Sequence, residues 1–264
     1  MSEPEAFYLR HEGGFVATEL TRGPWAPDAQ HGGPPAALLV TELLRRHRRD
    51  GMTMSRVTVE ILGPVPLGPL TVSTSVLRPG RGVELLGATV AAGGRDVLRG
   101  QAWLVRSIDT ELPSDLPHPA DPPPLPPADG GALYPSAYDV GYHTGMAWRS
   151  VRGSFSELGP ASVWMRMRHP LVAGEDIEPV ARAVIAADCG NGLSGVLDFA
   201  RWHFVNPDLT VYLTRPPVGE WVHLDASTTV EAGGVGLAQS ALSDERGPVG
   251  RGLQSLYVAP RRSV

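Results

Sequence analysis

Hydrophobic and polar positions alternate in two long tracts of the chain, one in each half. In the first half the alternation predicts four strands separated by Gly and Pro turns, at residues 55–62, 70–78, 83–93 and 97–106. An apolar pattern with helical spacing precedes them at residues 32–51, where Pro34 and Pro35 suit a first turn and Gly51 suits an end. The pattern is typical of one helix followed by an antiparallel meander.

The same order returns in the second half. A glycine-rich segment at residues 188–199 predicts the start of a second helix, with Asp188 as a candidate N-cap. Four strand-like segments follow it, at residues 204–215, 221–230, 235–244 and 249–258.

The two tracts align without a gap when the first is shifted by 152 positions. Residues 57–105 then lie against residues 209–257, and 11 of the 49 pairs are identical, Thr58 and Thr210 among them. This count favours an internal duplication over a convergence of turn spacings, which is the alternative. Two fused copies would pair their sheets edge to edge, with both helix starts near the interface, and such interfaces are preferred sites for ligands.

A proline-rich segment separates the two tracts. Eight prolines lie between residues 113 and 127, a density that favours polyproline II and disfavours helix or sheet. The chain is therefore expected to contain an N-terminal unit at residues 1–111, a linker at residues 112–135 and a C-terminal unit at residues 136–264.

The composition of the chain excludes several classes of partner and of chemistry. The 264 residues carry a net charge of −5 and no basic run, so nucleic acid is not an expected partner. All 23 basic residues are Arg, and the absence of Lys excludes Schiff-base and P-loop chemistry. A single cysteine, no signal-peptide pattern and no long apolar run predict a cytoplasmic protein without a membrane segment.

Four segments, taken in order, resemble the double-hotdog acyl-CoA thioesterases, specifically the acyl-CoA thioesterase II-like group. They are HGGPPAALL (31–39), ADCGNGLSG (187–195), FVNPDLTVYLTRPPVGEW (204–221) and RGLQSLYVAP (251–260). The resemblance covers nearly the whole chain outside the linker and implies an α+β double hotdog. It also implies hydrolysis of acyl-CoA or acyl carrier protein thioesters with no metal or organic cofactor. Sheet edges and helix faces that need cover suggest a homo-oligomer.

The resemblance also implies a site in the second unit, where an Asp, a Thr or Ser, and a Gln position the attacking water. The Asp matches Asp188 and the Gln matches Gln254. The Thr or Ser position falls on Asn206, a departure, because an amide can hold a water but brings no hydroxyl. Each has a plainer alternative: a helix cap for Asp188, an outward strand residue for Gln254 and an Asx turn for Asn206.

Three residues at the start of the first helix are further candidates. Gly32 and Gly33 allow a thioester to approach the backbone, and the N–H of Gly33 is a candidate oxyanion donor. A tight turn into a helix is the alternative for the two glycines. His31 is a candidate substrate contact, with a structural histidine as the alternative. Cys189 would need a histidine partner to act as a nucleophile, so we expect a small packed residue there.

Phosphates of CoA imply arginines near the mouth of the site, with Arg201 and Arg215 as candidates. No G-x-S-x-G or H-E-x-x-H motif occurs, which disfavours a Ser-His-Asp hydrolase and a zinc site. Two other functions stay open. One is a dehydratase, isomerase or cyclase that acts on an acyl or polyketide intermediate with the same fold, and the other is a non-catalytic acyl-CoA-binding protein.

Overall fold

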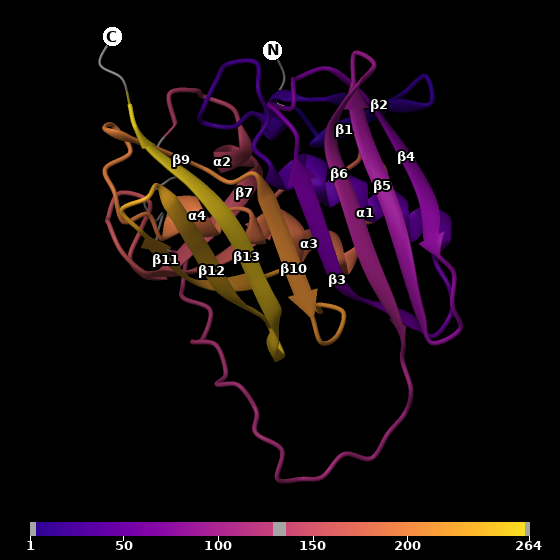
Figure 1. Cartoon of the computed structure of the whole chain (residues 1–264). Helices are drawn as coiled ribbons and strands as arrows, with labels where there is room; N and C mark the ends of the chain where they lie inside the picture. Colours follow the sequence, from indigo (N-terminus) through magenta and orange to yellow (C-terminus); the bar gives the residue numbers. More distant parts are fainter. Residues whose placement is uncertain (1–3, 129–135, 262–264) are drawn as a thin grey trace.

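The computed structural model describes residues 4–128 and 136–261. Strands from both halves join into one antiparallel sheet, and the helices lie against one side of it (Figure 1). The strand order is β1-β2-β4-β5-β6-β3-β10-β13-β12-β11-β8-β7, with β9 paired to β13. The expected α+β class, with hotdog-like helix-on-sheet packing, is therefore present.

The elements have the following bounds. The strands of the first half are β1 Tyr8–His11, β2 Gly14–Ala17, β3 Met52–Ile61, β4 Pro69–Arg78, β5 Val83–Ala92 and β6 Arg95–Arg106. The strands of the second half are β7 Met146–Arg152, β8 Ala161–Met167, β9 Trp202–Val205, β10 Asp208–Leu213, β11 Val222–Val230, β12 Val235–Asp244 and β13 Gly247–Pro260. The helices are η1 Glu19–Thr21, α1 Gly33–His47, α2 Tyr142–Gly145, α3 Pro179–Ala187 and α4 Gly190–Leu193.

The two halves meet edge to edge through β3 and β10. Thr58 lies opposite Thr210, and their hydroxyl groups form a hydrogen bond of 3.1 Å. On either side Val57 pairs with Val211, and Val59 with Leu209. A pair of residues 152 positions apart thus sits at the centre of this strand pair, and both ends of β12 also lie 152 positions after those of β5. The expected edge-to-edge pairing is confirmed.

Glycine at matching positions lets a helix approach the sheet in each half. A Cβ added at Gly100 would lie 2.7 Å from a methyl of Leu39 on α1. A Cβ added at Gly252, which is 152 positions later, would lie 3.2 Å from the Cβ of Ala187 on α3. A side chain at either position would therefore crowd the helix, against a movable leucine methyl at Gly100 and against the Cβ of Ala187 at Gly252.

The first helix begins where the sequence predicts it but ends at His47, before the predicted end at Gly51. Pro34 and Pro35 lie in the first turn of α1, and Leu38, Leu39 and Leu43 are fully buried against the sheet. Among the residues that the structure describes, no helix is long and apolar enough to cross a membrane.

The predicted second helix start at residue 188 is wrong. The longer helix α3 ends at Ala187, Asp188 is its C-cap, and only the single turn α4 follows. Three of the six residues from 190 to 195 are Gly, which weakens a helix, whereas the Ala-rich segment before them begins with Pro179 at the first turn. Glycine marks the end of a helix more strongly than its start, and here the glycine run follows the helix.

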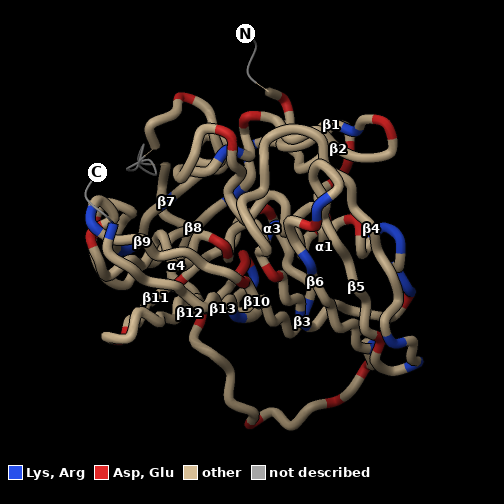
Figure 2. The backbone as a smooth tube through the Cα atoms, turned by 45° about the horizontal axis from the view of Figure 1, so that its top comes forward, with Lys and Arg blue, Asp and Glu red and all other residues tan. Residues whose placement is uncertain are grey.

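The connection between the halves has no helix or strand from residue 107 to residue 128. It carries acidic residues but no Lys or Arg, and it loops away from the sheet before it returns to the second half (Figures 1 and 2). On its return the carbonyls of Pro123 and Pro126 accept hydrogen bonds from Trp164 and Arg149, at 3.1 and 2.8 Å. The rest of the predicted linker, residues 129–135, lies outside the described residues.

Candidate active site

Asp188 lies at the junction of α3 and α4 and is only 4% exposed. Side chains from three other segments converge on its carboxylate. His31 Nδ1 lies 3.0 Å from Oδ2. Asn206 Nδ2 and Gln254 Nε2 donate to Oδ1 at 3.0 and 3.3 Å. The structure therefore brings together four of the side chains singled out in the sequence.

Gln254 on β13 is 2% exposed, so it is not an outward strand residue. Its Nε2 also donates to the backbone oxygen of Asp188 at 3.1 Å. Its Oε1 accepts the N–H of Asn191 at 3.0 Å. Both ends of the amide are thereby held at the α3–α4 junction, and Gln254 ties the last strand to the carboxylate.

Asn206 lies between β9 and β10. Besides its bond to Asp188, its Nδ2 lies 3.3 Å from the carbonyl oxygen of Asp208, and its Oδ1 accepts from Asn191 Nδ2 at 3.4 Å. It thus makes a local contact typical of a turn and two long-range contacts as well. The amide takes part in the network on both sides, as a donor and as an acceptor.

The start of α1 packs against the end of α3. A Cβ added at Gly32 would lie 2.8 Å from Asp188 Oδ2, and one at Gly33 would lie 2.7 Å from the carbonyl oxygen of Ile185. Neither position has room for a side chain. Because the carboxylate of Asp188 faces the N-terminal end of α1, the positive end of that helix dipole favours its charge. The favourable dipole thus comes from α1, in the other half of the chain.

His31 is 6% exposed, and its ring stacks on the ring of Tyr142, with centroids 4.0 Å apart. Its Nε2 lies 3.9 Å from Cys189 Sγ. Burial by itself would lower the pKa of His31, but the negative charge of Asp188, together with Cys189, raises this pKa to about 10. His31 is therefore an imidazolium at neutral pH, paired with a buried carboxylate.

Two contacts compete for the Nδ1 of His31. The N–H of Gly33 approaches it at 3.1 Å and Asp188 Oδ2 at 3.0 Å, and one nitrogen cannot both accept and donate. The ion pair is the stronger arrangement, because an unprotonated Nδ1 would direct its lone pair at a carboxylate oxygen. The N–H of Gly33 is then not taken up by His31.

Cys189 is 1% exposed and Tyr142 is 1% exposed. The thiol donates to the Tyr142 hydroxyl at 3.3 Å, which in turn donates to the carbonyl oxygen of Ile185 at 2.7 Å. The histidine partner absent near Cys189 in the sequence is thus supplied by residue 31. Sequence reasoning missed Tyr142 and Asn191; no motif marks the tyrosine, whereas Asn191 lies within the quoted ADCGNGLSG segment.

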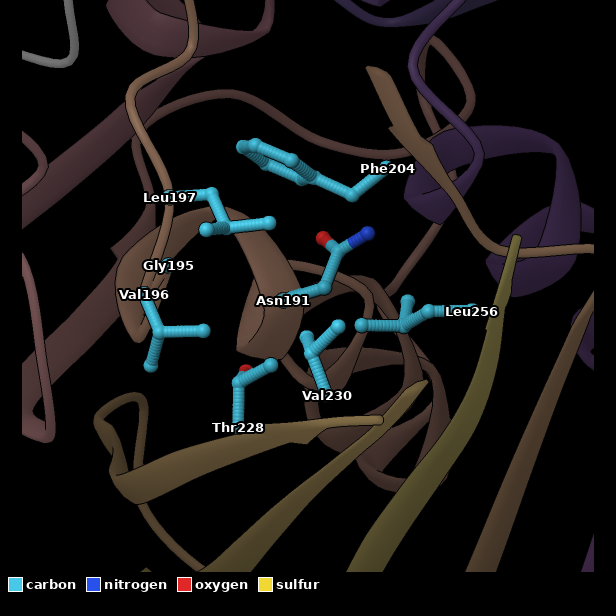
Figure 3. Close-up of a pocket in the computed structure, with 8 residues that line it drawn as sticks. All are labelled: Asn191, Gly195, Val196, Leu197, Phe204, Thr228, Val230 and Leu256. Atoms are coloured by element: carbon cyan, nitrogen blue, oxygen red, sulfur yellow. The ribbon is translucent and has the colours of Figure 1, made fainter. Parts of the chain in front are cut away.

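An apolar pocket adjoins this polar cluster. It is small, with room for about one water molecule, and part of it is open to solvent. Its lining consists of Asn191, Gly195, Val196, Leu197, Phe204, Thr228, Val230 and Leu256 (Figure 3). Asn191 belongs to both the pocket and the cluster, because it also contacts Gln254 and Asn206. Asn191 therefore links the pocket to the residues around Asp188.

The two candidate arginines lie apart from these contacts. Arg215 is bound to Asp244, with Nη2 to Oδ1 at 2.8 Å. Arg201 is exposed just before β9. Across residues 4–128 and 136–261, no three His, Cys, Asp or Glu side chains are placed to hold a metal ion together.

Comparison with known protein families finds two matches, which together cover most of the chain. Residues 21–105 match the acyl-CoA thioesterase N-terminal domain, and residues 113–258 match the acyl-CoA thioesterase C-terminal domain. The chain therefore belongs to the acyl-CoA thioesterase family. Comparison with curated proteins finds no match.

Solved structures show the same fold at low sequence identity. A proposed thioesterase from Novosphingobium aromaticivorans is 21% identical, with a TM-score of 0.73 over 95% of this chain and 98% of that one. A protein with a hot dog fold from Alicyclobacillus acidocaldarius is 16% identical, with a TM-score of 0.72 over 97% and 96%. The acyl-CoA thioesterase II TesB2 from Mycobacterium marinum is 16% identical, with a TM-score of 0.63 over 89% and 90%. These likenesses establish the hotdog fold.

Proposed function

We propose that this protein hydrolyses acyl-CoA or acyl carrier protein thioesters by direct attack of a water molecule that Asp188 activates. The observation that carries the proposal is the convergence of Asn206 and Gln254 on the buried carboxylate of Asp188, beside an apolar pocket. Membership of the acyl-CoA thioesterase family supports thioester hydrolysis in general and an acyl-CoA substrate.

Each residue has a role in this scheme. Asp188 takes a proton from water while the oxygen adds to the thioester carbonyl; the C–S bond then breaks, and the leaving thiolate takes the proton from Asp188. General base assistance of this kind contributes roughly 10²–10⁴-fold in rate. The amides of Asn206 and Gln254 orient the carboxylate and the water, so Asn206 takes the place of the family's hydroxyl. Backbone N–H groups at the start of α1, with Gly33 first, stabilise the oxyanion.

In this proposal the acyl group enters at the pocket, whose apolar side chains move apart to admit it. Burial of each methylene contributes about 0.8 kcal/mol to binding. Arg201 is the proposed contact for the CoA phosphates, and Arg201→Ala should raise KM for acyl-CoA more than it changes kcat. Arg215 is left out because Asp244 holds its guanidinium group.

We also propose that the two halves are fused copies of one hotdog unit. The matched strand bounds of β5 and β12 support this, as do Gly100 and Gly252 and the central pair Thr58 and Thr210. The homo-oligomer and the cytoplasmic location remain predictions from the sequence.

Thiol release from a panel of acyl-CoAs of graded length tests the activity. The purified protein should release free CoA, and Asp188→Asn should lose roughly 10²–10⁴-fold in kcat while it stays folded. Asp225→Asn, at a half-exposed carboxylate on β11, is the matched control and should keep full activity.

Each alternative has its own signature in this assay. A dehydratase or isomerase would change the acyl group without freeing thiol. A binding protein would hold acyl-CoA equally well with and without the carboxylate at position 188. Full hydrolysis by a folded Asp188→Asn protein would refute the role of Asp188.

A further inference from the structure

His31 supplies the positive charge next to the carboxylate of Asp188. Among the residues that the structure describes, it is the one cationic side chain in an ion pair with Asp188. Both side chains are more than nine-tenths buried, at 7% and 4% exposure. The other two donors to this carboxylate, Asn206 and Gln254, are neutral amides. A buried carboxylate without a paired charge is costly and takes up a proton instead.

The hydrogen bonds of Tyr142 and Cys189 agree with a doubly protonated His31. The Tyr142 hydroxyl donates to the carbonyl oxygen of Ile185, and the Cys189 thiol donates to that hydroxyl. The sulfur is then left to accept from His31 Nε2 at 3.9 Å, while Nδ1 donates to Asp188. Each donor in this series of hydrogen bonds, from Tyr142 through Cys189 and His31, has an acceptor when both ring nitrogens of His31 carry a proton.

The position of the ring is set from two directions. Its face is stacked on Tyr142 of α2, and its backbone leads directly into α1. Within residues 4–128 and 136–261, the titratable groups in contact with it include Asp188 and Cys189 from the α3–α4 junction and Tyr142 from α2. The imidazolium is therefore held by packing as well as by charge.

We infer that His31 is a positioning residue that keeps the carboxylate of Asp188 ionised and oriented, so that Asp188 works as a base only as half of a buried ion pair. The inference rests on the proposed role of Asp188. It assigns residue 31 to the carboxylate, and not to the substrate or the oxyanion. A protonated carboxyl group cannot take a proton from water, so the pair extends activity toward acidic pH.

Two substitutions separate charge from orientation. His31→Asn keeps a hydrogen-bond donor near the position of Nδ1 but removes the positive charge. His31→Phe keeps an aromatic ring stacked on Tyr142 but removes both the donor and the charge. In each variant the acid limb of the pH profile of kcat should move to higher pH, because the carboxylate has lost its paired cation. His31→Asn should approach the wild-type rate at alkaline pH, and His31→Phe should stay at least tenfold below it.

The control is His47→Asn, at the opposite end of α1, where His47 contacts Thr74. It should leave the pH profile unchanged. A lower kcat with an unmoved acid limb in the His31 variants would show a merely structural role and overturn the inference. If His31→Phe does not fold, His31→Asn decides the question.

A direct measurement separates this inference from the proposed function. Nitrogen-15 NMR of the histidine side chains should show both ring nitrogens of His31 protonated at pH 7 in the wild-type protein and only one in Asp188→Asn. A neutral His31 at pH 7 overturns the inference whether or not thiol is released. Absence of thiol release with a protonated His31 would refute the hydrolase and leave the ion pair standing.

Discussion

Two buried carboxylates in the second half of the chain have opposite surroundings. Asp244, at the end of β12, is 0% exposed and is bound by Arg215 and by the backbone N–H groups of Val218 and Arg246. Asp188 is nearly as buried, but its partners are a histidine and two amides. Arginine stays charged at every accessible pH, whereas histidine can lose its proton.

The difference separates a structural pair from the pair that we propose to be functional. Burial works to raise the pKa of Asp244, but the hydrogen bonds from Arg215 and the backbone outweigh it and hold this pKa below its usual value. These partners all lie near the turn between β12 and β13. The partners of Asp188 come from both halves of the chain, and its cluster adjoins a pocket. A site for chemistry keeps a less saturated, titratable carboxylate next to a space for substrate.

The largest effect on stability should come from Arg215→Ala. It leaves the carboxylate of Asp244 buried without its cation, and the free energy of unfolding should fall by about 3 kcal/mol, since Arg215 is partly exposed. Urea unfolding measures this, and kcat per folded molecule should stay within twofold of wild type. Loss of activity without loss of stability would remove the distinction between the two carboxylates.

The largest effect on kcat in this comparison should come from Gly32→Ala. The new Cβ would lie 2.8 Å from Asp188 Oδ2 and must displace the carboxylate. Because a displacement of about 1 Å can cost roughly 100-fold in rate, we expect kcat to fall between 10- and 100-fold. Gly63→Ala, where no atom lies near the added Cβ, is the control. An unchanged kcat in Gly32→Ala would show that Asp188 tolerates movement.

A smaller effect concerns stability and pH. The folded-state pKa of His31 is about 10, above the ordinary histidine value of 6.5, so the folded protein binds the extra proton. The raised pKa of His31 therefore stabilises the folded state. This stabilisation is fully present below pH 6.5 and is lost as the pH rises toward 10. Urea unfolding at pH 6, 8 and 10 should show the decline, and His31→Asn should flatten it. The lowered pKa values of buried His143 and His223 act in the opposite direction, below pH 6.5.

The smallest effect is expected from Cys189→Ser. A hydroxyl keeps a donor to Tyr142 and an acceptor for His31, so kcat should change less than threefold. Thiol release and the pH profile are the measurements. A complete loss of turnover would instead indicate that the Cys189 sulfur attacks the thioester.

The sequence predicted much of the fold because strand patterns and repeats are local or periodic signals. The strands β4, β5, β11 and β12 lie close to the predicted ranges, and α1 forms where its apolar face and prolines indicate. The second helix was misplaced because the glycine run from 190 to 195 follows α3 and does not begin a long helix. The strands β1, β2, β7 and β8 were not predicted, because they lie outside the repeated tracts.

By itself the sequence determined the doubled pattern, the resemblance to thioesterases and the candidates Asp188, Asn206 and Gln254. Only the tertiary structure decided that His31 is the partner of Asp188, although 157 positions separate them in the chain. The physical reason is the contact between the start of α1 and the end of α3, where two glycines leave room for the carboxylate and the backbone. That contact joins the two halves across the sheet's helix-covered side, and no local pattern of residues encodes it.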